Sequence, residues 1–122
     1  MSIHSLNKNV EDSVWENDVI MEIRERIVRA FLDLIVLMKL SEGCELLGGY
    51  DFIKLITEEF DVMLSPGSIY AALYSMERDG LIQASSNRRK RVYTLTDKGE
   101  ATVKTISEEK TKILYLFGSL FV

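Results

Sequence analysis

The sequence predicts a mainly α-helical fold that carries one small β-hairpin. Apolar residues recur every three or four positions through most of the 122-residue chain, which is the spacing of amphipathic helices. The exceptions are LIQAS and RVYTL, two short runs that fit strands and are separated by SNRRK. With 47% hydrophobic and 28% charged residues, the composition is that of an ordinary globular domain with a buried core.

The first predicted helix is the longest in the chain. Residues 1–14 show no clear period, and we expect a flexible or partly ordered tail there. From Trp15 the apolar residues recur at helical spacing, and neither Gly nor Pro interrupts them before Gly43 ends the helix. The pattern is also compatible with two helical segments that meet near Arg26–Arg29.

Two shorter helices follow a turn formed by Leu-Leu-Gly-Gly. The segment GYDFIKLITEEF is the second predicted helix. The third begins at Ser65, a favourable N-cap, with Pro66 at the first helical position, where its missing N–H costs nothing. This helix stops at Gly80, because glycine readily takes the left-handed conformation found just after a helix.

The hairpin and a final helix complete the predicted elements. Asn87 is the expected turn residue of the hairpin, because Asn tolerates positive φ. Thr96 is the expected N-cap of the last helix, and Gly99 in its first turn permits close packing. We expect residues 99–122 to form a single helix with one apolar stripe.

The reactive residues exclude several function classes. One Cys and one His leave no disulfide framework, no Cys-based zinc site and no multi-His metal site. Neither a cofactor motif nor a nucleophile–base set is visible, so we expect no enzyme activity, no cofactor and no metal. No apolar run approaches the 18 or so residues that span a bilayer, and no signal peptide is visible. We therefore expect a cytoplasmic protein.

Charge is distributed unevenly along the chain. The net charge of −4 argues against nucleic acid as a partner. However, residues 1–64 carry 6 Lys/Arg and 13 Asp/Glu, which gives −7, whereas residues 65–98 carry 6 and 3, which gives +3. The positive charge is concentrated in Arg88-Arg89-Lys90-Arg91, at the predicted hairpin tip. A local cationic field of this kind favours docking on phosphates despite the acidic total.

Three helices followed by a two-stranded hairpin is the order of a winged helix-turn-helix domain. In such a domain the third helix enters a major groove, and the hairpin, or wing, reaches the neighbouring backbone or minor groove. Small residues at the start of the third helix, Ser65, Gly67 and Ser68, allow close approach to a phosphate, which the helix dipole favours. Further along this helix, Tyr70 and Tyr74 are expected to face away from the core.

Three stretches resemble the PadR family of transcriptional regulators. LDLIVLMKLSEG and the following GGYDFIKLI look like the family's first two helices. LSPGSIYAALYSMERDGLI is similar to its recognition helix, with Ala71 where the family usually has Pro, and RRKRVYTLTDKGE looks like its wing. The resemblance covers about residues 30–100. It implies a homodimeric, sequence-specific DNA-binding repressor of the short-tailed branch, whose N-terminal and C-terminal helices build the dimer.

These expectations divide the chain into a tail (1–14), a winged helix-turn-helix domain with a long N-terminal helix (15–98) and a C-terminal dimerisation helix (99–122). The expected partners are double-stranded DNA and a second copy of the chain. The predicted DNA-contacting residues are Ser65, Pro66, Gly67, Ser68, Tyr70, Ala71, Tyr74, Arg78, Asn87, Arg88, Arg89, Lys90 and Arg91. The predicted dimer-interface residues are Trp15, Val19, Ile23, Ile27, Ile106, Ile113, Leu114, Phe117 and Phe121.

Two alternatives stand beside this interpretation. The acidic first half is compatible with a winged-helix module that binds other proteins and not DNA. The resemblance also implies a possible small aromatic effector, since related proteins can hold flat aromatic molecules between subunits. Trp15, Tyr115, Phe117 and Phe121 are the candidates to line such a space, although aromatic stripes at helical spacing are more often plain interfaces.

Overall fold

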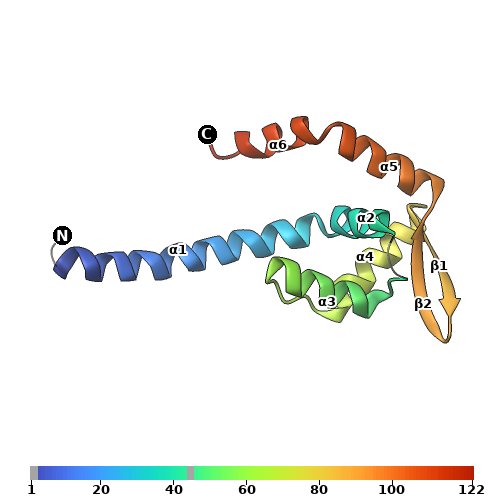
Figure 1. Ribbon diagram of the computed structural model, residues 1–122, viewed down its shortest axis with the longest axis horizontal. Helices are drawn as coiled ribbons and strands as arrows, with labels where there is room; N and C mark the ends of the chain where they lie inside the picture. The colour runs from blue at the N-terminus through green and yellow to red at the C-terminus, as the bar shows by residue number, and fades with distance from the viewer. Residues whose placement is uncertain (1–2, 44–45) are drawn as a thin grey trace.

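The computed structural model describes residues 3–43 and 46–122, with side chains from residue 15 onward. Within these ranges it shows six helices and one two-stranded antiparallel hairpin, which confirms the predicted mainly α-helical fold (Figure 1). α1 and α2 follow one another, α3 and α4 lie beside α2, and α5 leads into α6, which runs back towards the N-terminal side (Figure 1). The elements are α1 (Ile3–Ala30), α2 (Leu32–Glu42), α3 (Gly49–Phe60), α4 (Pro66–Arg78), β1 (Ile82–Asn87), β2 (Lys90–Leu95), α5 (Asp97–Glu108) and α6 (Lys110–Ser119).

The long N-terminal helix bends at Phe31, between α1 and α2. Phe31 has φ −113° and ψ 26°, outside the helical range. Its N–H still donates to Ile27 O, and the Ile35 N–H donates to Phe31 O, both at 3.0 Å, whereas the Leu34 N–H donates to Asp33 Oδ1 at 2.9 Å, so the helical hydrogen-bond pattern is interrupted at the bend. The predicted alternative of two segments is confirmed, with the junction slightly beyond Arg26–Arg29.

α1 begins earlier than the apolar pattern predicts. It starts at Ile3, whereas the helical period is clear only from Trp15. Neither Gly nor Pro stands between these two residues, so no helix-breaking residue type ends the helix there. The side chains of residues 1–14 lie outside the described part of the structure, so the predicted tail stays a prediction.

The C-terminal segment bends at Glu109, between α5 and α6, so the predicted single helix over residues 99–122 is wrong. Glu109 has φ −102° and ψ 15°. Its N–H donates to Thr105 O at 2.9 Å, and its carbonyl oxygen accepts from the Ile113 N–H at 3.1 Å, so Glu109 ends α5 and begins α6. The bend directs α6 along α1 (Figure 1), where the ring centroids of Phe31 and Phe117 lie 5.5 Å apart. This long-range ring contact is what local sequence patterns could not indicate.

The predicted ends of α4 and the start of α5 are confirmed. The Ser68 N–H donates to Ser65 Oγ at 3.2 Å, so Ser65 is the N-cap of α4 and Pro66 its first residue. Gly80 follows the end of α4 with φ +77°, in the left-handed region. The Thr96 hydroxyl accepts a hydrogen bond from the first turn of α5 in the same way. These local signals therefore fix where α4 begins and ends.

The core lies between α2, α3, α4 and the hairpin. Leu37, Phe52 and Ile69, one from each of these helices, are among its largest fully buried side chains. β2 joins this core through Tyr93, whose N–H donates to Leu47 O at 3.0 Å in an isolated bridge. One face of α4 is thereby held in the core, and the wing is attached to the chain segment that precedes α3.

The turn of the wing differs from the prediction. β1 and β2 pair in antiparallel register up to Asn87 and Lys90, so the loop consists of Arg88 and Arg89 alone. These arginines have φ values of 50° and 67°, as a two-residue type I′ turn requires of both central residues. Asn87 therefore ends a strand, and its predicted role as the turn residue is wrong. Asn87 does not adopt a positive φ, because it is paired with Lys90 as part of the strand.

Candidate nucleic-acid interface

α4 presents an exposed face on the side away from the core. Ile69 and Leu73 are completely buried, whereas Tyr70 and Tyr74 are 50% and 69% exposed. Tyr70 and Tyr74 are four residues apart, so they share one face of the helix, and Ala71 beside them is exposed too. The structure thus confirms that the two tyrosines face away from the core.

The first turn of α4 is open to solvent and holds only small residues. Ser65, Pro66 and Gly67 are exposed, and Ser68 is half-buried. The hydroxyls of Ser65 and Ser68 lie 2.9 Å apart and form a hydrogen bond. A Cβ placed on Gly67 would meet nothing nearer than Ser65 Oγ at 4.0 Å, so space remains above this turn. A phosphate could approach the helix N-terminus closely here.

Two adjacent glycines bring α4 and the wing to the same end of α3. A Cβ on Gly49 would overlap the Tyr70 ring, so that ring lies directly against the backbone of α3. A Cβ on Gly48 would lie 2.8 Å from Arg91 O and 3.1 Å from Lys90 Cε, which are parts of the wing. Neither glycine can be replaced without moving one of these neighbours, and the exposed face of α4 is therefore continuous with the start of β2, next to the turn of the wing.

Lys90 is bound to α3 and does not extend freely from the wing. Its Nζ lies 2.5 Å from Asp51 Oδ2, and the same oxygen accepts a hydrogen bond from the Gly48 N–H at 2.8 Å. Partial burial raises the pKa of Asp51, but the hydrogen bonds from Lys90 and Gly48 and the charge of Lys90 outweigh it and hold the pKa below its usual value. Asp51 is thus ionised at neutral pH and pairs with the lysine.

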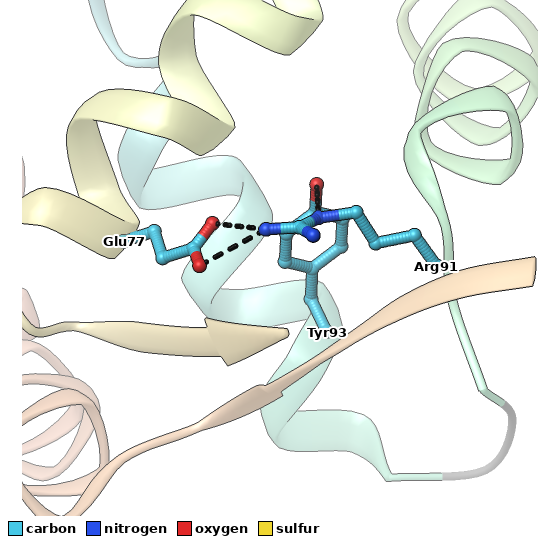
Figure 2. A network of polar contacts seen from close by, with 3 residues as sticks. All are labelled: Glu77, Arg91 and Tyr93. Carbon is cyan, nitrogen blue, oxygen red and sulfur yellow. Dashed lines mark hydrogen bonds and ion pairs between the residues drawn. The ribbon is translucent and has the colours of Figure 1, made fainter. Parts of the chain in front are cut away.

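Arg91 is bound to α4 and to its own strand (Figure 2). Its Nη2 donates to both carboxylate oxygens of Glu77, at 3.0 and 3.1 Å. Its Nε donates to Tyr93 Oη at 3.3 Å, and the guanidinium carbon lies 5.9 Å from the centroid of that ring. These hydrogen bonds raise the pKa of Arg91 further, so the guanidinium stays charged. A network of this kind is more ordered than a single surface ion pair.

Arg88 and Arg89 differ from the other two cations of the wing. Both are exposed, and neither side chain has a hydrogen-bond or ion-pair partner among the described residues. Their positions at the turn place them at the tip of the hairpin, beyond its last strand pair. They are the wing's uncompensated positive charges.

Arg78, at the end of α4, is mostly exposed and weakly held. Its Nε lies 3.8 Å from Asp79 Oδ1, and its Nη2 donates to Ser75 Oγ at 3.3 Å. Both partners are on the same helix or just beyond it, so neither fixes the side chain against another element. Arg78 thus remains available for a phosphate at the far end of α4.

The sequence analysis missed Asp51 and Glu77 as parts of this surface. No local pattern reveals that either carboxylate has a partner on a distant hairpin. Tyr50 was missed as well: it is 72% exposed beside Gly49, while Phe52 fills the core position of α3. Only the Gly-Gly doublet hinted at close packing, and it predicted no more than a turn.

The predicted dimer-interface residues lie on α1, α5 and α6, with Phe121 just beyond α6, and five of the nine are exposed. Trp15 and Phe121 are 70% and 69% exposed, and Val19, Ile113 and Leu114 are exposed as well. Ile23, Ile27, Ile106 and Phe117 are half-buried. A groove of about 400 Å³ lies between α1 and α6, with Phe31 and Phe117 among its walls.

The described residues offer neither a metal site nor a membrane-spanning helix. They contain no group of three or more His, Cys, Asp and Glu side chains that could hold a metal ion. In the same part of the chain, every helix is too short or too polar to cross a bilayer.

The model of the Transcriptional regulator PadR-like family matches residues 36–105. Among solved structures, a PadR-like transcriptional regulator from Bacillus cereus is 24% identical, with a TM-score of 0.63 over 79% of this chain and 96% of that one. A transcriptional regulator from Clostridium thermocellum is 23% identical, with a TM-score of 0.63 over 78% and 94%. F93 from STIV, a winged-helix DNA-binding protein, is 25% identical, with a TM-score of 0.56 over 65% and 86%. These likenesses confirm the winged-helix fold.

One curated relative has a different description. Riboflavin kinase from Pyrococcus furiosus is 33% identical over 86 residues, which is 69% of this chain. The chain spans only 38% of the length of that protein. Riboflavin kinase is therefore the name of a longer relative, whereas the two transcriptional regulators above match over most of this chain and nearly all of their own length.

Proposed function

Because the chain belongs to the PadR-like family of transcriptional regulators, we propose that it is a homodimeric repressor that binds operator DNA. In this proposal α4 is the recognition helix in the major groove, and the wing contacts the adjacent backbone or minor groove. The observation that carries it is the continuity of the exposed face of α4 with the basic wing, joined at Gly48 and Gly49.

Different parts of this surface suit the two tasks of binding DNA tightly and of recognising its sequence. The first turn of α4 and the tip arginines face solvent with donors that suit phosphate oxygens. Tyr70, Ala71 and Tyr74 offer hydroxyl and methyl groups that suit base edges, such as the methyl group of thymine. The wing then supplies salt-dependent affinity, and α4 supplies the preference for a sequence.

A second copy of the chain is the proposed occupant of the apolar surfaces on α1 and α6. Trp15, Leu114 and Phe121 are large, apolar and mostly exposed, and soluble monomers seldom expose a contiguous patch of this kind. Pairing these surfaces would present two recognition helices to half-sites about one helical turn, roughly 34 Å, apart. The groove beside Phe117 is also the candidate site for a small aromatic effector; Phe121 is among its walls, whereas Trp15 and Tyr115 are not. Binding of a fluorescent aromatic probe that Phe117→Ala abolishes would place an effector there.

A fluorescence-anisotropy titration tests the proposed function. The labelled probe is DNA from upstream of the protein's own gene, competed with random duplex at about 50 and 200 mM salt. Tight, salt-sensitive binding that random duplex fails to displace is the expected result. Equal and weak binding to both duplexes would contradict specificity for this probe. Absence of binding even at low salt would favour the alternative, a winged-helix module that binds proteins, which the acidic first half of the chain makes the second candidate.

Two substitutions separate the proposed roles. Arg89→Ala should weaken binding to every sequence and flatten the salt dependence, because a phosphate contact is lost. Tyr70→Ala should reduce affinity for the operator more than affinity for random duplex. Equal losses on both duplexes for Tyr70→Ala would contradict a role of this residue in base preference.

A further inference from the structure

The four cations of the wing do not have equivalent surroundings. Lys90 and Arg91 each contact a carboxylate on a different helix, whereas Arg88 and Arg89 have no side-chain partner among the described residues. The run looks uniform in the sequence, so this difference arises only from the fold.

Lys90 joins one side of the wing to the start of α3. The pair with Asp51 is 2.5 Å long, and Asp51 is itself fixed by the Gly48 N–H at 2.8 Å. Gly48 lies so close to the wing that a Cβ there would stand 3.1 Å from Lys90 Cε. The lysine stem therefore lies against the backbone, and its ammonium group is directed to α3.

Arg91 joins the other side of the wing to α4. It donates to both oxygens of Glu77 and to the hydroxyl of Tyr93, a residue only 5% exposed (Figure 2). Tyr93 is in turn bonded through its backbone to Leu47. The guanidinium thus connects the recognition helix to a strand whose own position is fixed by the core.

We propose that the basic run has two functions: Arg88 and Arg89 bind DNA phosphates, whereas Lys90 and Arg91 are positioning residues that fix the wing relative to α4 through Asp51 and Glu77. This inference rests on the proposed function. A cation already paired with a carboxylate adds little net charge to the surface and must give up its partner to bind a phosphate. Fixing the tip before binding lowers the ordering cost of contacting DNA with α4 and the wing together.

The salt dependence of binding to a labelled random-sequence duplex separates the two functions. Arg88→Ala and Arg89→Ala should each reduce the slope of log K against log salt by about 0.9, the value for one lost phosphate contact. Lys90→Ala and Arg91→Ala should leave the slope close to that of the wild type while lowering the affinity, because the tip still reaches phosphate from a less ordered wing. An Arg91→Ala slope reduced as much as that of Arg88→Ala would overturn the assignment.

A charge swap provides a second and independent test. Arg91→Glu alone should weaken DNA binding, and adding Glu77→Arg should restore most of the affinity if the two residues act through each other. If Arg91 bound a phosphate directly, the double variant would remain weak, because a carboxylate would face the DNA at position 91. Glu58→Gln is the control for Glu77→Gln, since it removes the same charge from an exposed residue of α3 that forms no ion pair with α4 or the wing among the described residues. Glu77→Gln should bind more weakly than this control; equal binding would count against the positioning role.

Measurements on the free protein test whether Glu77 orders the tip of the wing without being needed for the fold. Backbone ¹⁵N relaxation of Arg88 and Arg89 should report greater mobility in Glu77→Gln than in the wild type, while urea unfolding stays a single transition. Unchanged mobility would overturn the proposal. Wild-type protein that shows no salt-dependent binding would instead overturn the proposed function, and the division with it. Wild-type binding with four equal slope changes would overturn the division alone.

Discussion

Arg88 and Arg89 hold backbone angles that arginine seldom adopts. Their φ values of 50° and 67° lie in the left-handed region, which each non-glycine residue occupies at a cost of about 1 kcal/mol or more. Asn-Gly is the usual pair in such a turn. Two adjacent guanidinium groups add mutual repulsion in the free protein. The Arg-Arg turn is therefore less stable than an Asn-Gly turn at the same place would be. A role of both side chains in binding would explain why arginines stand there.

Replacing the tip by Arg88→Asn and Arg89→Gly should make the protein more stable and a weaker DNA binder. We expect the free energy of unfolding in urea to rise by about 1 to 2 kcal/mol, because both residues then suit positive φ. Anisotropy should show weaker binding to random duplex. The control is Arg88→Ala with Arg89→Ala, which removes the same charges but keeps the unfavourable angles. A tip variant no more stable than this control would contradict the account of strain.

The absence of a side chain at Gly49 makes room for the ring of Tyr70. Gly49→Ala should destabilise the protein by about 1 to 3 kcal/mol, because the new methyl group overlaps the Tyr70 ring. In a Tyr70→Ala background the same change should cost much less, since alanine is the better helix former. Urea unfolding of the four proteins of this double-mutant cycle gives the coupling. Gly67→Ala, at a glycine with open space above it, is the control and should not destabilise. Equal costs of Gly49→Ala in both backgrounds would contradict the contact.

At the scale of elements, the pairing of the wing with α3 depends on an ionised carboxylate. The pKa of Asp51 is below its unfolded value of about 3.9, so the pair stabilises the folded state above that value, and the contribution is lost as the pH falls through the folded pKa. Asp51→Asn should therefore be less stable than the wild type at pH 7 by up to about 1 kcal/mol, since the pair is partly exposed. Urea unfolding from pH 7 to pH 2 should show this difference closing below about pH 4. A difference that persisted in acid would mean that Asp51 acts through something other than its charge.

Local chemistry explains which elements the sequence predicted. Ser65, Gly80 and Thr96 end or begin helices through hydrogen bonds and backbone angles within a few residues, and each was correctly assigned. The bends at Phe31 and Glu109 involve neither Gly nor Pro, and each of these residues is hydrogen-bonded to the helices on both sides, so no local signal fixes their positions.

The same distinction separates the predicted parts of the candidate interface from the missed ones. The basic run and the exposed face of α4 follow from composition and period. The partners of that run do not, because Glu77 and Arg91 are 14 residues apart and meet only when the hairpin folds against α4. The prediction for Asn87 was wrong because it used only the conformational preference of asparagine. The register of the strands, which the sequence does not reveal, pairs Asn87 with Lys90.

At the scale of the whole molecule, the positive charge is local to the wing. The wing and the first turns of α1 lie at opposite ends (Figure 1). Residues 3–30, which form α1, carry 4 Lys/Arg and 6 Asp/Glu, whereas residues 31–64, which include α2 and α3 near the wing, carry 2 and 7. An approaching duplex is therefore attracted to the exposed arginines of the wing tip and not to that end of the molecule as a whole. The net charge of −4 is a poor guide to such a partner, because phosphates respond to the local field.

The exposed apolar residues of α6 are expected to hold the two chains of the proposed dimer together. In the proposed dimer Leu114 packs against the partner, so Leu114→Glu should place a charge in the interface and shift the protein towards monomer in sedimentation-velocity experiments. Leu114 is 61% exposed within one chain, so the substitution should leave the fold of that chain intact. Lys112→Gln is the control, because it changes the charge of α6 by the same amount on the other side of the helix. A monomer presents one recognition helix, so operator affinity should fall more steeply than binding to random duplex. A Leu114→Glu protein that sediments as the same dimer as Lys112→Gln would show that α6 does not hold the two chains together.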